Sequence, residues 1–151
     1  MAALAALVSA CTGPASDANV SAQEQSRSQQ RTEEPMKIRI VTADRTLTAV
    51  LDDHAAARDF AALLPIELTL SDYNRTEKIA DLPRRLSVEE APDGIKPSAG
   101  DIAYYAPWGN LAIFYRDFGY SRGLVRLGRL EGGTDALEKL DEGRVRIERI
   151  P

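Results

Sequence analysis

The feature that most constrains the fold is a series of short segments in which apolar and polar residues alternate, each ended by turn-forming residues. In the segment 36–42, MKIRIVT, the side chains of Met36, Ile38 and Ile40 fall on one face. Alternation with a period of two predicts a strand buried on one side, because successive side chains of a strand point to opposite faces. The segment 46–51, TLTAVL, follows after a short turn, and this spacing predicts a hairpin.

The same pattern predicts more strands further along the chain and only two short helices. We expect strands at 66–72, near 77–79, and at 101–107, 111–117, 122–130 and 144–150. We expect helices at 52–65, capped by Asp52 or Asp53 and ended by Pro65, and at 133–143, capped by Thr134. The segment 88–101 is rich in Pro and Gly, which favours a loop. About eight short strands joined mostly by hairpins predict a mainly β fold, a closed antiparallel barrel with two short helices.

The chain divides into a leader at 1–11, a linker at 12–35 and a folded domain at 36–151. The leader, MAALAALVSAC, is an apolar run too short to span a bilayer, which needs about 20 residues, and it is typical of a signal peptide. Its last four residues, VSAC, resemble the lipobox of bacterial lipoproteins, in which the cysteine, here Cys11, receives lipid. The alternative is an Ala-rich leader with an ordinary free cysteine.

The linker 12–35 is rich in Ser, Gln, Ala and Glu and holds one large aliphatic residue, Val20. A segment of this composition cannot bury enough apolar surface to offset the entropy lost on ordering, so we expect a disordered tether. With lipid on Cys11, such a tether would hold the domain near a membrane. The sequence therefore predicts a monomeric domain in the cell envelope, lipid-anchored or periplasmic, that meets the membrane only through this anchor.

Net charge and the rarest residue types exclude several classes of function. The net charge is −4 and half of it lies in 1–35, so neither part is basic and binding to nucleic acid is not expected. Cys11 and His54 are the only residues of their types, which excludes an internal disulfide, a structural zinc site and a His-rich metal site. His54 falls in the first turn of a predicted helix, where a surface role is favoured over catalysis. We expect no metal and no cofactor.

Seven of the nine aromatic residues lie between positions 101 and 130. They are Tyr104, Tyr105, Trp108, Phe114, Tyr115, Phe118 and Tyr120. Within the predicted strands the rings fall on both faces, because Tyr104 alternates with Tyr105 and Phe114 with Tyr115. Rings on both faces predict burial on two sides, in the barrel interior and under a helix-covered exterior. Core packing is therefore the favoured role of Tyr104 and Phe114.

Trp108 differs from the other rings because it lies in the turn between two predicted strands. A tryptophan there either folds back over the end of the barrel or stands in a binding cleft, and its indole N–H needs a partner in both cases. Tyr120 and Arg122 can lie beside Tyr73 and Lys78, which would supply rings for stacking and cations for a carboxylate or phosphate. The candidate ligand-binding residues are Tyr73, Lys78, Tyr105, Trp108, Tyr115, Tyr120 and Arg122.

Charged residues of the same region allow two other assignments. The arginines can form ion pairs on a solvated face, an alternative favoured for Arg126 and Arg129. The pairs so predicted join Arg122, Arg126 and Arg129 to Asp117, Glu131 and Glu148. Strict alternation in 122–130 places Arg126 and Arg129 on opposite faces. Asp72 and Glu77, close in sequence, are a candidate acid and base.

Two segments resemble the bacterial cyclophilin-like fold family, a group of small and largely uncharacterised domains. They are LTLSDYNRTEKIADLPRRLS at 68–87 and GDIAYYAPWGNLAIFYRDFGYSRGLVRLGRLEGG at 100–133. The resemblance covers about 36–150 and implies a cyclophilin-type barrel closed by two helices. True cyclophilins are peptidyl-prolyl isomerases with an arginine beside an apolar pocket, which here would be Arg116 beside Phe114 and Tyr115. Their familiar Phe-His-Arg and Gln-Gly-Gly-Asp segments are missing from this chain.

These features favour a non-catalytic, extracytoplasmic binding domain that recognises a small molecule or a peptide at the Trp108 end of the barrel. One alternative is a peptidyl-prolyl isomerase that uses Arg116. Another is a protein-docking module without a pocket of its own. The leading hypothesis depends on one structural expectation, that Trp108, Tyr73 and Arg116 line one shared opening.

Overall fold

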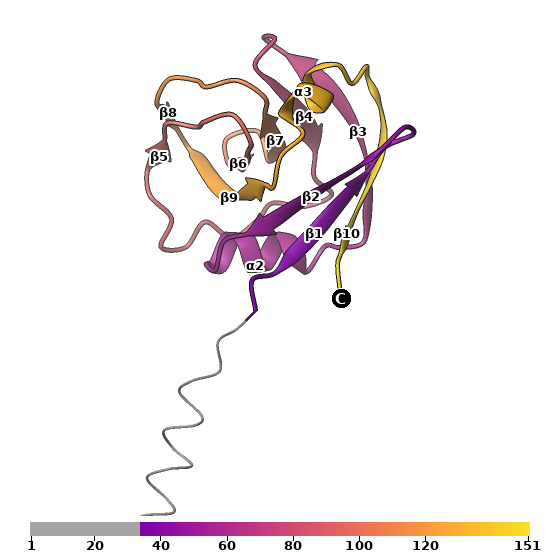
Figure 1. The fold of residues 1–151 in the computed structure, drawn as a ribbon. Helices are drawn as coiled ribbons and strands as arrows, with labels where there is room; N and C mark the ends of the chain where they lie inside the picture. The colour runs from indigo at the N-terminus through magenta and orange to yellow at the C-terminus, as the bar shows by residue number, and fades with distance from the viewer. Residues whose placement is uncertain (1–33) are drawn as a thin grey trace, which may run out of the picture. The chain divides into compact units, whose positions relative to one another are not determined.

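The computed structural model describes residues 34–151, so the leader, Cys11 and nearly all of the linker lie outside the described residues. The described residues form ten strands and two helices (Figure 1). The strands are β1 Lys37–Val41, β2 Thr46–Leu51, β3 Ile66–Tyr73, β4 Glu77–Asp81, β5 Gly94–Ile95, β6 Asp101–Tyr105, β7 Asn110–Phe114, β8 Ser121–Arg122, β9 Leu124–Leu130 and β10 Gly143–Arg149. The helices are α2 Ala55–Ala61 and α3 Thr134–Glu138.

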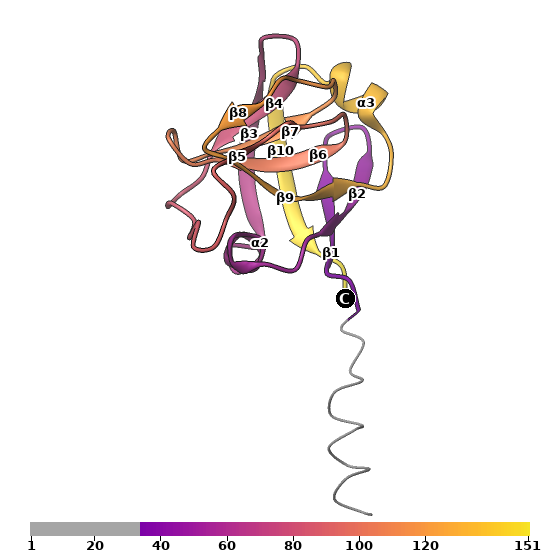
Figure 2. The same cartoon turned by 90° about the vertical axis from the view of Figure 1, so that its left-hand side faces the viewer.

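Eight of the strands close an antiparallel barrel in the order β1-β10-β3-β4-β7-β6-β9-β2, with β2 returning to pair with β1. The predicted fold class, a mainly β closed antiparallel barrel with two short helices, is confirmed. The first and last barrel strands are neighbours, and the N–H of Ile150 donates to the carbonyl of Lys37 at 2.9 Å. β5 and β8 form a separate two-stranded sheet on one side of the barrel (Figure 2).

The barrel interior is filled by the apolar sides of the alternating strands. Ile38 and Ile40 of β1 are fully buried, and β1 pairs with β2 as the predicted hairpin. Tyr104 of β6 is buried in the same core, and its hydroxyl accepts a hydrogen bond from the N–H of Leu86 at 3.2 Å. That bond satisfies the polar end of an otherwise apolar ring, so core packing of Tyr104 is confirmed.

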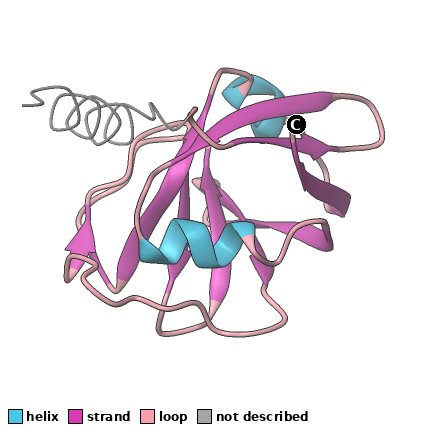
Figure 3. Cartoon of the chain, turned by 90° about the horizontal axis from the view of Figure 1, so that it is seen from below, coloured by secondary structure: helices cyan, strands magenta, loops and turns pink. Residues whose placement is uncertain are grey.

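The two helices lie at opposite ends of the barrel (Figures 1 and 3). Phe60 of α2 and Leu137 of α3 are almost completely buried, and both belong to the same apolar cluster as the interior strand residues. Each helix therefore contributes a large side chain that fills one end of the barrel. Without these side chains the interior would be open to water at both ends.

The helix caps differ from the prediction. His54 caps α2, and its Nδ1 accepts a hydrogen bond from the N–H of Ala57 at 3.4 Å. Asp52 and Asp53 do not cap, because each forms an ion pair with an arginine instead. In α3, Thr134 is the first helical residue and makes no side-chain cap, because the preceding glycine adopts the left-handed conformation at the cap position.

Strand β9 departs from strict alternation. Ile102 and Ala103 are neighbours in β6, but their partners in β9, Gly128 and Arg126, are two positions apart, so the residue between them is extra. Such a β-bulge shifts the phase of the strand beyond it. Arg126 and Arg129 consequently both point outward and are exposed, and the prediction that they lie on opposite faces is wrong.

The exposed arginines of β9 are paired, but with partners other than those predicted. Arg126 contacts Asp52, and Arg129 contacts Asp101, each at 2.8 Å. The acids predicted for them are occupied elsewhere, because Glu131 pairs with Lys37, and Glu148 pairs with Arg39 and Arg146. The third of the predicted acids, Asp117, accepts a hydrogen bond from the N–H of Ala99. Closeness in sequence does not predict these ion pairs, because the partners are determined by which strands lie side by side in the barrel.

The outer face of β6, β7 and β9 is also apolar. Ala103, Ala112, Phe114 and Leu124 form a second buried cluster, against which Ile95 of β5 packs. The exterior is therefore covered here by the small β5–β8 sheet, and the prediction of a helix-covered exterior is wrong. The burial of Phe114 on this side is confirmed.

Candidate functional site

A cavity of about 190 Å³ opens on the outer face of the barrel beside the second apolar cluster. We call it the aromatic pocket, because five rings line it: Tyr73, Tyr105, Trp108, Phe114 and Phe118. Its other walls come from the turn after β3, from β4 and β7, and from β8 and the start of β9. No Lys, Arg or His is among the residues that line it.

Strand register explains why these side chains meet. Tyr73 of β3 lies opposite Glu77 of β4, which in turn lies opposite Phe114 of β7, so the three form one row across the sheet. Four positions before Phe114 in β7, Asn110 lies opposite Tyr105 of β6 and forms another row. Because alternate residues of a strand share a face, both rows point to the outside of the barrel.

Trp108 lies at the mouth of the pocket. Its ring packs edge-to-face with Tyr73 at 5.6 Å and with Tyr105 at 5.4 Å between ring centroids. The turn that carries it is closed by Gly109, whose φ of 74° allows its N–H to donate to the carbonyl of Tyr105. Trp108 remains 54% exposed and Phe118 43% exposed. Of the two positions predicted for Trp108, the structure places it in a cleft.

Two polar side chains in this pocket are buried without a partner. Four polar side chains are buried within residues 34–151, namely Glu77, Lys78, Asp101 and Asn110. Lys78 pairs with Asp72, and Asp101 with Arg129. By contrast, Oε2 of Glu77 and Oδ1 of Asn110 have no hydrogen-bond partner among the described residues, and both side chains line the aromatic pocket. A buried acceptor that lacks a donor costs about 1–3 kcal/mol, so this arrangement needs an explanation.

The electrostatics of Glu77 follow from its burial. Only 9% of the residue is exposed. Burial, together with the smaller effect of the negative charge of Asp72 on the neighbouring strand, raises the pKa of its carboxyl to about 7. Glu77 therefore exchanges a proton near neutral pH, and a donor brought into the pocket would face a group whose charge depends on pH.

Neither buried acceptor was identified as a ligand-binding residue from the sequence. Asn110 was not singled out, and Glu77 was considered only as the acid–base partner of Asp72. Those two carboxyls line different cavities, Glu77 the aromatic pocket and Asp72 a second one. A usable signal was present, since a polar residue at an outward position beside the apolar Ile79 and Ala112 interrupts an otherwise apolar face.

Three of the predicted site residues, Arg116, Lys78 and Tyr115, line a second cavity at one end of the barrel. There the Tyr115 hydroxyl donates to Asp72 at 2.6 Å, and the Lys78 ammonium donates to the same carboxyl at 2.9 Å. These two hydrogen bonds lower the pKa of Asp72, and burial raises the pKa of Tyr115 to about 12. Arg116 is exposed and pairs with Glu138. The side chains of Asp72, Lys78, Tyr115 and Arg116 in this second cavity are therefore already paired.

The expectation that Trp108 and Arg116 share one opening is wrong, because they line different cavities. The predicted strand 111–117 ends at Phe114. Beyond it, the N–H groups of Tyr115 and Arg116 both donate to the carbonyl of Thr76, so the chain turns away from the outer face before Arg116.

Tyr120 and Arg122 also lie outside the aromatic pocket. Tyr120 is 63% exposed, and neither residue lines the cavity to which Tyr73 contributes. Arg122 is in β8, where it lies opposite Gly94 of β5. The predicted cleft of Tyr73, Lys78, Tyr120 and Arg122 is therefore not formed, whereas Tyr73, Tyr105 and Trp108 are brought together as neighbours.

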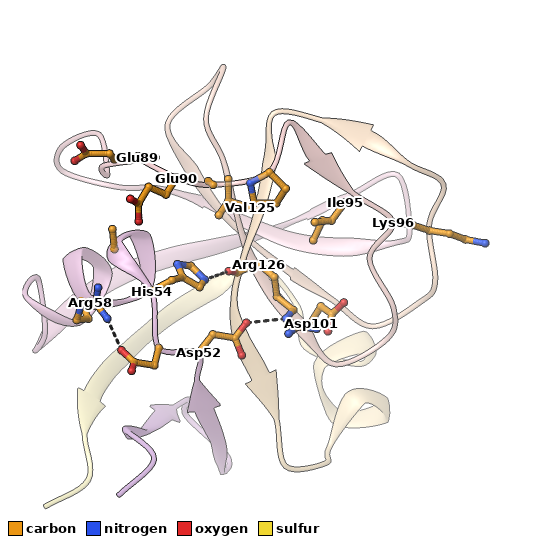
Figure 4. Close-up of a pocket in the computed structure, with 14 residues that line it drawn as sticks. Asp52, His54, Arg58, Glu89, Glu90, Ile95, Lys96, Asp101, Val125 and Arg126 are labelled. Atoms are coloured by element: carbon orange, nitrogen blue, oxygen red, sulfur yellow. Dashed lines mark hydrogen bonds and ion pairs between the residues drawn. The ribbon is translucent and has the colours of Figure 1, made fainter. Parts of the chain in front are cut away.

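A larger cavity, about 580 Å³, lies between the start of α2 and the segment that leads into β5 (Figure 4). Two ion pairs lie in its wall: Arg58 pairs with Asp53, and Arg126 with Asp52. The Nε2 of His54 contacts the carbonyl of Arg126 at 2.7 Å, so both ring nitrogens of this histidine have partners. Glu89, Glu90 and Lys96 also line this cavity, but they are exposed to water, whereas the unpartnered acceptors of the aromatic pocket are buried.

Within 34–151, no group of three or more His, Cys, Asp or Glu side chains is arranged to hold a metal ion. None of the helices in that range is long and apolar enough to cross a bilayer.

Comparison with known proteins identifies the fold family. Residues 40–148 match the sequence profile of the cyclophilin-like family. The chain belongs to the cyclophilin-like family. A hypothetical protein from Archaeoglobus fulgidus, known from a solution structure, superposes with a TM-score of 0.56 at 21% identity, covering 77% of this chain and 95% of the other. That likeness concerns the fold alone. No protein with curated annotation matches the sequence. The predicted resemblance to cyclophilin-like domains is thus confirmed, and the function of this cyclophilin-like domain has to be argued from its own pocket.

Proposed function

We propose that this cyclophilin-like domain is a binding domain that holds a small molecule or a peptide side chain in the aromatic pocket. The observation that carries the proposal is the pair of buried acceptors without donors, Glu77 and Asn110, within a cavity walled by rings. A mostly apolar cavity with a few convergent polar groups is the usual form of a ligand site. A ligand with donors would satisfy both acceptors and cover the exposed parts of Trp108 and Phe118.

The same pocket supports binding better than catalysis. Prolyl isomerisation of the cyclophilin type requires a cationic group beside an apolar pocket, and no Lys, Arg or His lines this one. Arg116, the residue considered for that role, is exposed at another cavity and paired with Glu138. A docking module without a pocket is also less favoured, because a cavity is present where Trp108 lies.

Replacing Trp108 with alanine is expected to weaken ligand binding at least tenfold and to leave the fold intact. The indole covers Tyr73 and Tyr105 at the pocket mouth, but it is half-exposed and so contributes little to the core. The measurement is NMR titration of labelled protein with a library of charged and neutral fragments and N-acetylated tripeptides, following the pocket amides. Tyr120→Ala, which removes an exposed ring outside the pocket, is the matched control. If no fragment shifts the pocket amides of the unmodified protein, the proposed function is wrong.

An extracytoplasmic location is part of the proposal and is supported only by the leader sequence that ends at Cys11. If Cys11 receives lipid, Cys11→Ser should move the full-length protein from the membrane fraction to the soluble fraction of the cell. Cell fractionation followed by immunoblotting measures this. The same distribution for both proteins would contradict lipid anchoring and would leave the pocket proposal untouched.

A further inference from the structure

We propose that the ligand of the aromatic pocket is an elongated organic cation, an ammonium group joined through a short aliphatic chain to a second N–H donor. The inference rests on the proposed function and names the chemical class of its ligand. In the proposed complex the ammonium binds Glu77, and the second donor reaches Asn110. A free diamine has this chemistry, and so does a lysine residue of a peptide.

The first support is the chemical type of the two unpartnered atoms. Both Oε2 of Glu77 and Oδ1 of Asn110 are acceptors, and both residues are more than nine-tenths buried. The pocket is lined by no basic residue that could supply the missing donor. An anion would therefore meet a carboxylate without a compensating cation, whereas an ammonium supplies three donors and the opposite charge.

The second support is the ring geometry. Trp108 stands at 87° to Tyr73 and at 80° to Tyr105, so the rings meet edge-to-face instead of stacking. An edge-to-face contact covers only one ring face of each pair, which leaves other faces of the π systems free. Ring faces within about 6 Å attract cations, most strongly when water is excluded.

The third support is the spacing of the two acceptors. Glu77 lies opposite Phe114, and Asn110 lies four positions earlier than Phe114 in the same strand. Four strand residues span about 13 Å along the strand. The two side chains shorten the distance between their acceptor atoms, but a single ammonium group cannot contact both acceptors. Between the two rows lie the apolar Ile79 and the small Ala112, which face each other across β4 and β7. A ligand with polar ends and an aliphatic middle matches this order of acceptor, apolar floor and acceptor.

The proposal predicts that binding strengthens as pH rises. Burial and Asp72 hold the pKa of Glu77 at about 7, so the carboxyl is mostly neutral at pH 6 and mostly charged at pH 8. The side chains opposite Glu77 are the rings of Tyr73 on β3 and Phe114 on β7. An aliphatic ammonium keeps its charge throughout, so its affinity follows the ionisation of Glu77 and should rise about tenfold from pH 6 to pH 8.

The test titrates the full-length protein with 1,5-diaminopentane, 1-aminopentane and 1,5-pentanediol, following the fluorescence of Trp108, the single tryptophan of the chain. We expect the diamine to bind at pH 8 at least tenfold more tightly than the diol, and about tenfold more weakly at pH 6. We expect the monoamine to bind with intermediate affinity, because it leaves Asn110 unpaired. Nα-acetyl-lysine N-methylamide has five carbons between its Nα and its Nζ, as the diamine has between its two nitrogens. If it binds more tightly than the diamine, the source is a peptide lysine; if the diamine binds more tightly, the source is a free diamine.

Variants localise the effect. Glu77→Gln should lower diamine affinity at least tenfold at pH 8 and abolish the dependence on pH. Asn110→Ala should remove the advantage of the diamine over the monoamine. Glu89→Gln, which removes a carboxylate from the wall of the larger cavity, is the control for general charge attraction and should change nothing.

The outcomes separate the inference from the proposed function. If the diol or neutral fragments bind as tightly as the diamine, the cation assignment is overturned and ligand binding in this pocket stands. If diamine binding falls with rising pH, or Glu89→Gln weakens it as much as Glu77→Gln, the assignment is also overturned. If no amine perturbs Trp108, the inference fails, and the fragment titration decides separately whether the pocket binds ligands. These comparisons use the unmodified protein first, so a variant that misfolds does not remove the test.

Discussion

Replacing Phe60 with alanine is expected to destabilise the domain by about 3–5 kcal/mol, the cost of deleting a buried ring and leaving a cavity. Phe60 is fully buried and fills one end of the barrel from α2, which also holds the buried Ala56 and Ala57. Loss of the ring would weaken the attachment of the whole helix, since few other large side chains join α2 to the interior. The melting temperature should fall by roughly 10–20 °C for a domain of this size.

Thermal and urea unfolding followed by circular dichroism measure this effect. Tyr120→Ala is the matched control, because it deletes an aromatic ring that is 63% exposed, and its cost should stay below about 1 kcal/mol. If Phe60→Ala lowers the free energy of unfolding no more than the control does, α2 does not close the barrel core.

Replacing Glu77 with glutamine is expected to stabilise the unliganded domain at pH 8 and to have little effect at pH 5. The folded-state pKa of Glu77 is raised from 4.5 to about 7, so the folded protein binds the proton more tightly than the unfolded chain does. Stability is therefore full below about pH 4.5, falls as pH rises through the interval to about 7, and stays reduced above it. Removing the charge should recover about 3 kcal/mol at most at pH 8, where the burial cost is complete.

Urea unfolding of both proteins across pH 5–8 measures the difference. Asp72→Asn is the control of opposite sign, because hydrogen bonds from Tyr115 and Lys78 lower the pKa of Asp72 and make its charge stabilising above its ordinary pKa. Asp72→Asn should therefore destabilise the domain at pH 8. A stability difference for Glu77→Gln that does not change with pH would show that Glu77 is not buried as a charge.

The two effects of Glu77 are linked. A buried carboxylate without a donor lowers stability in the empty protein and provides the attraction for a cationic ligand. A ligand that binds only the folded state adds to its stability in proportion to the logarithm of its concentration. The diamine should therefore raise the melting temperature of the unmodified protein at pH 8 and should have little effect on Glu77→Gln.

The barrel was predictable because its signal is local. Alternation in segments such as 36–42 and 144–150 sets which residues face the core, and short turns between strands require antiparallel neighbours. The errors arose where a residue depends on distant neighbours. The bulge in β9 depends on its pairing with β6, and the cap of α2 depends on ion pairs that draw Asp52 and Asp53 away.

The site was only partly predictable for the same reason. Trp108 and Tyr105 are close in sequence, so their proximity followed from one turn. Glu77 and Phe114 are 37 positions apart, and only the pairing of β4 with β7 makes them neighbours. Arg116 was misplaced because its distance from Phe114 suggested the same strand, whereas the chain turns directly after Phe114.

Because β1 and β10 are neighbours, the same barrel could be built from a chain in which the segments follow one another in a different order. Because the carbonyl of Lys37 already meets the N–H of Ile150, a few glycines joining Pro151 to Met36 would restore a continuous backbone across that seam. New termini could then be opened in the exposed stretch 87–90 without breaking a strand pair. Such a circularly permuted domain would carry the same pocket. Its new termini would allow a tag to be added, or the protein to be immobilised on a surface, at a different point of the molecule.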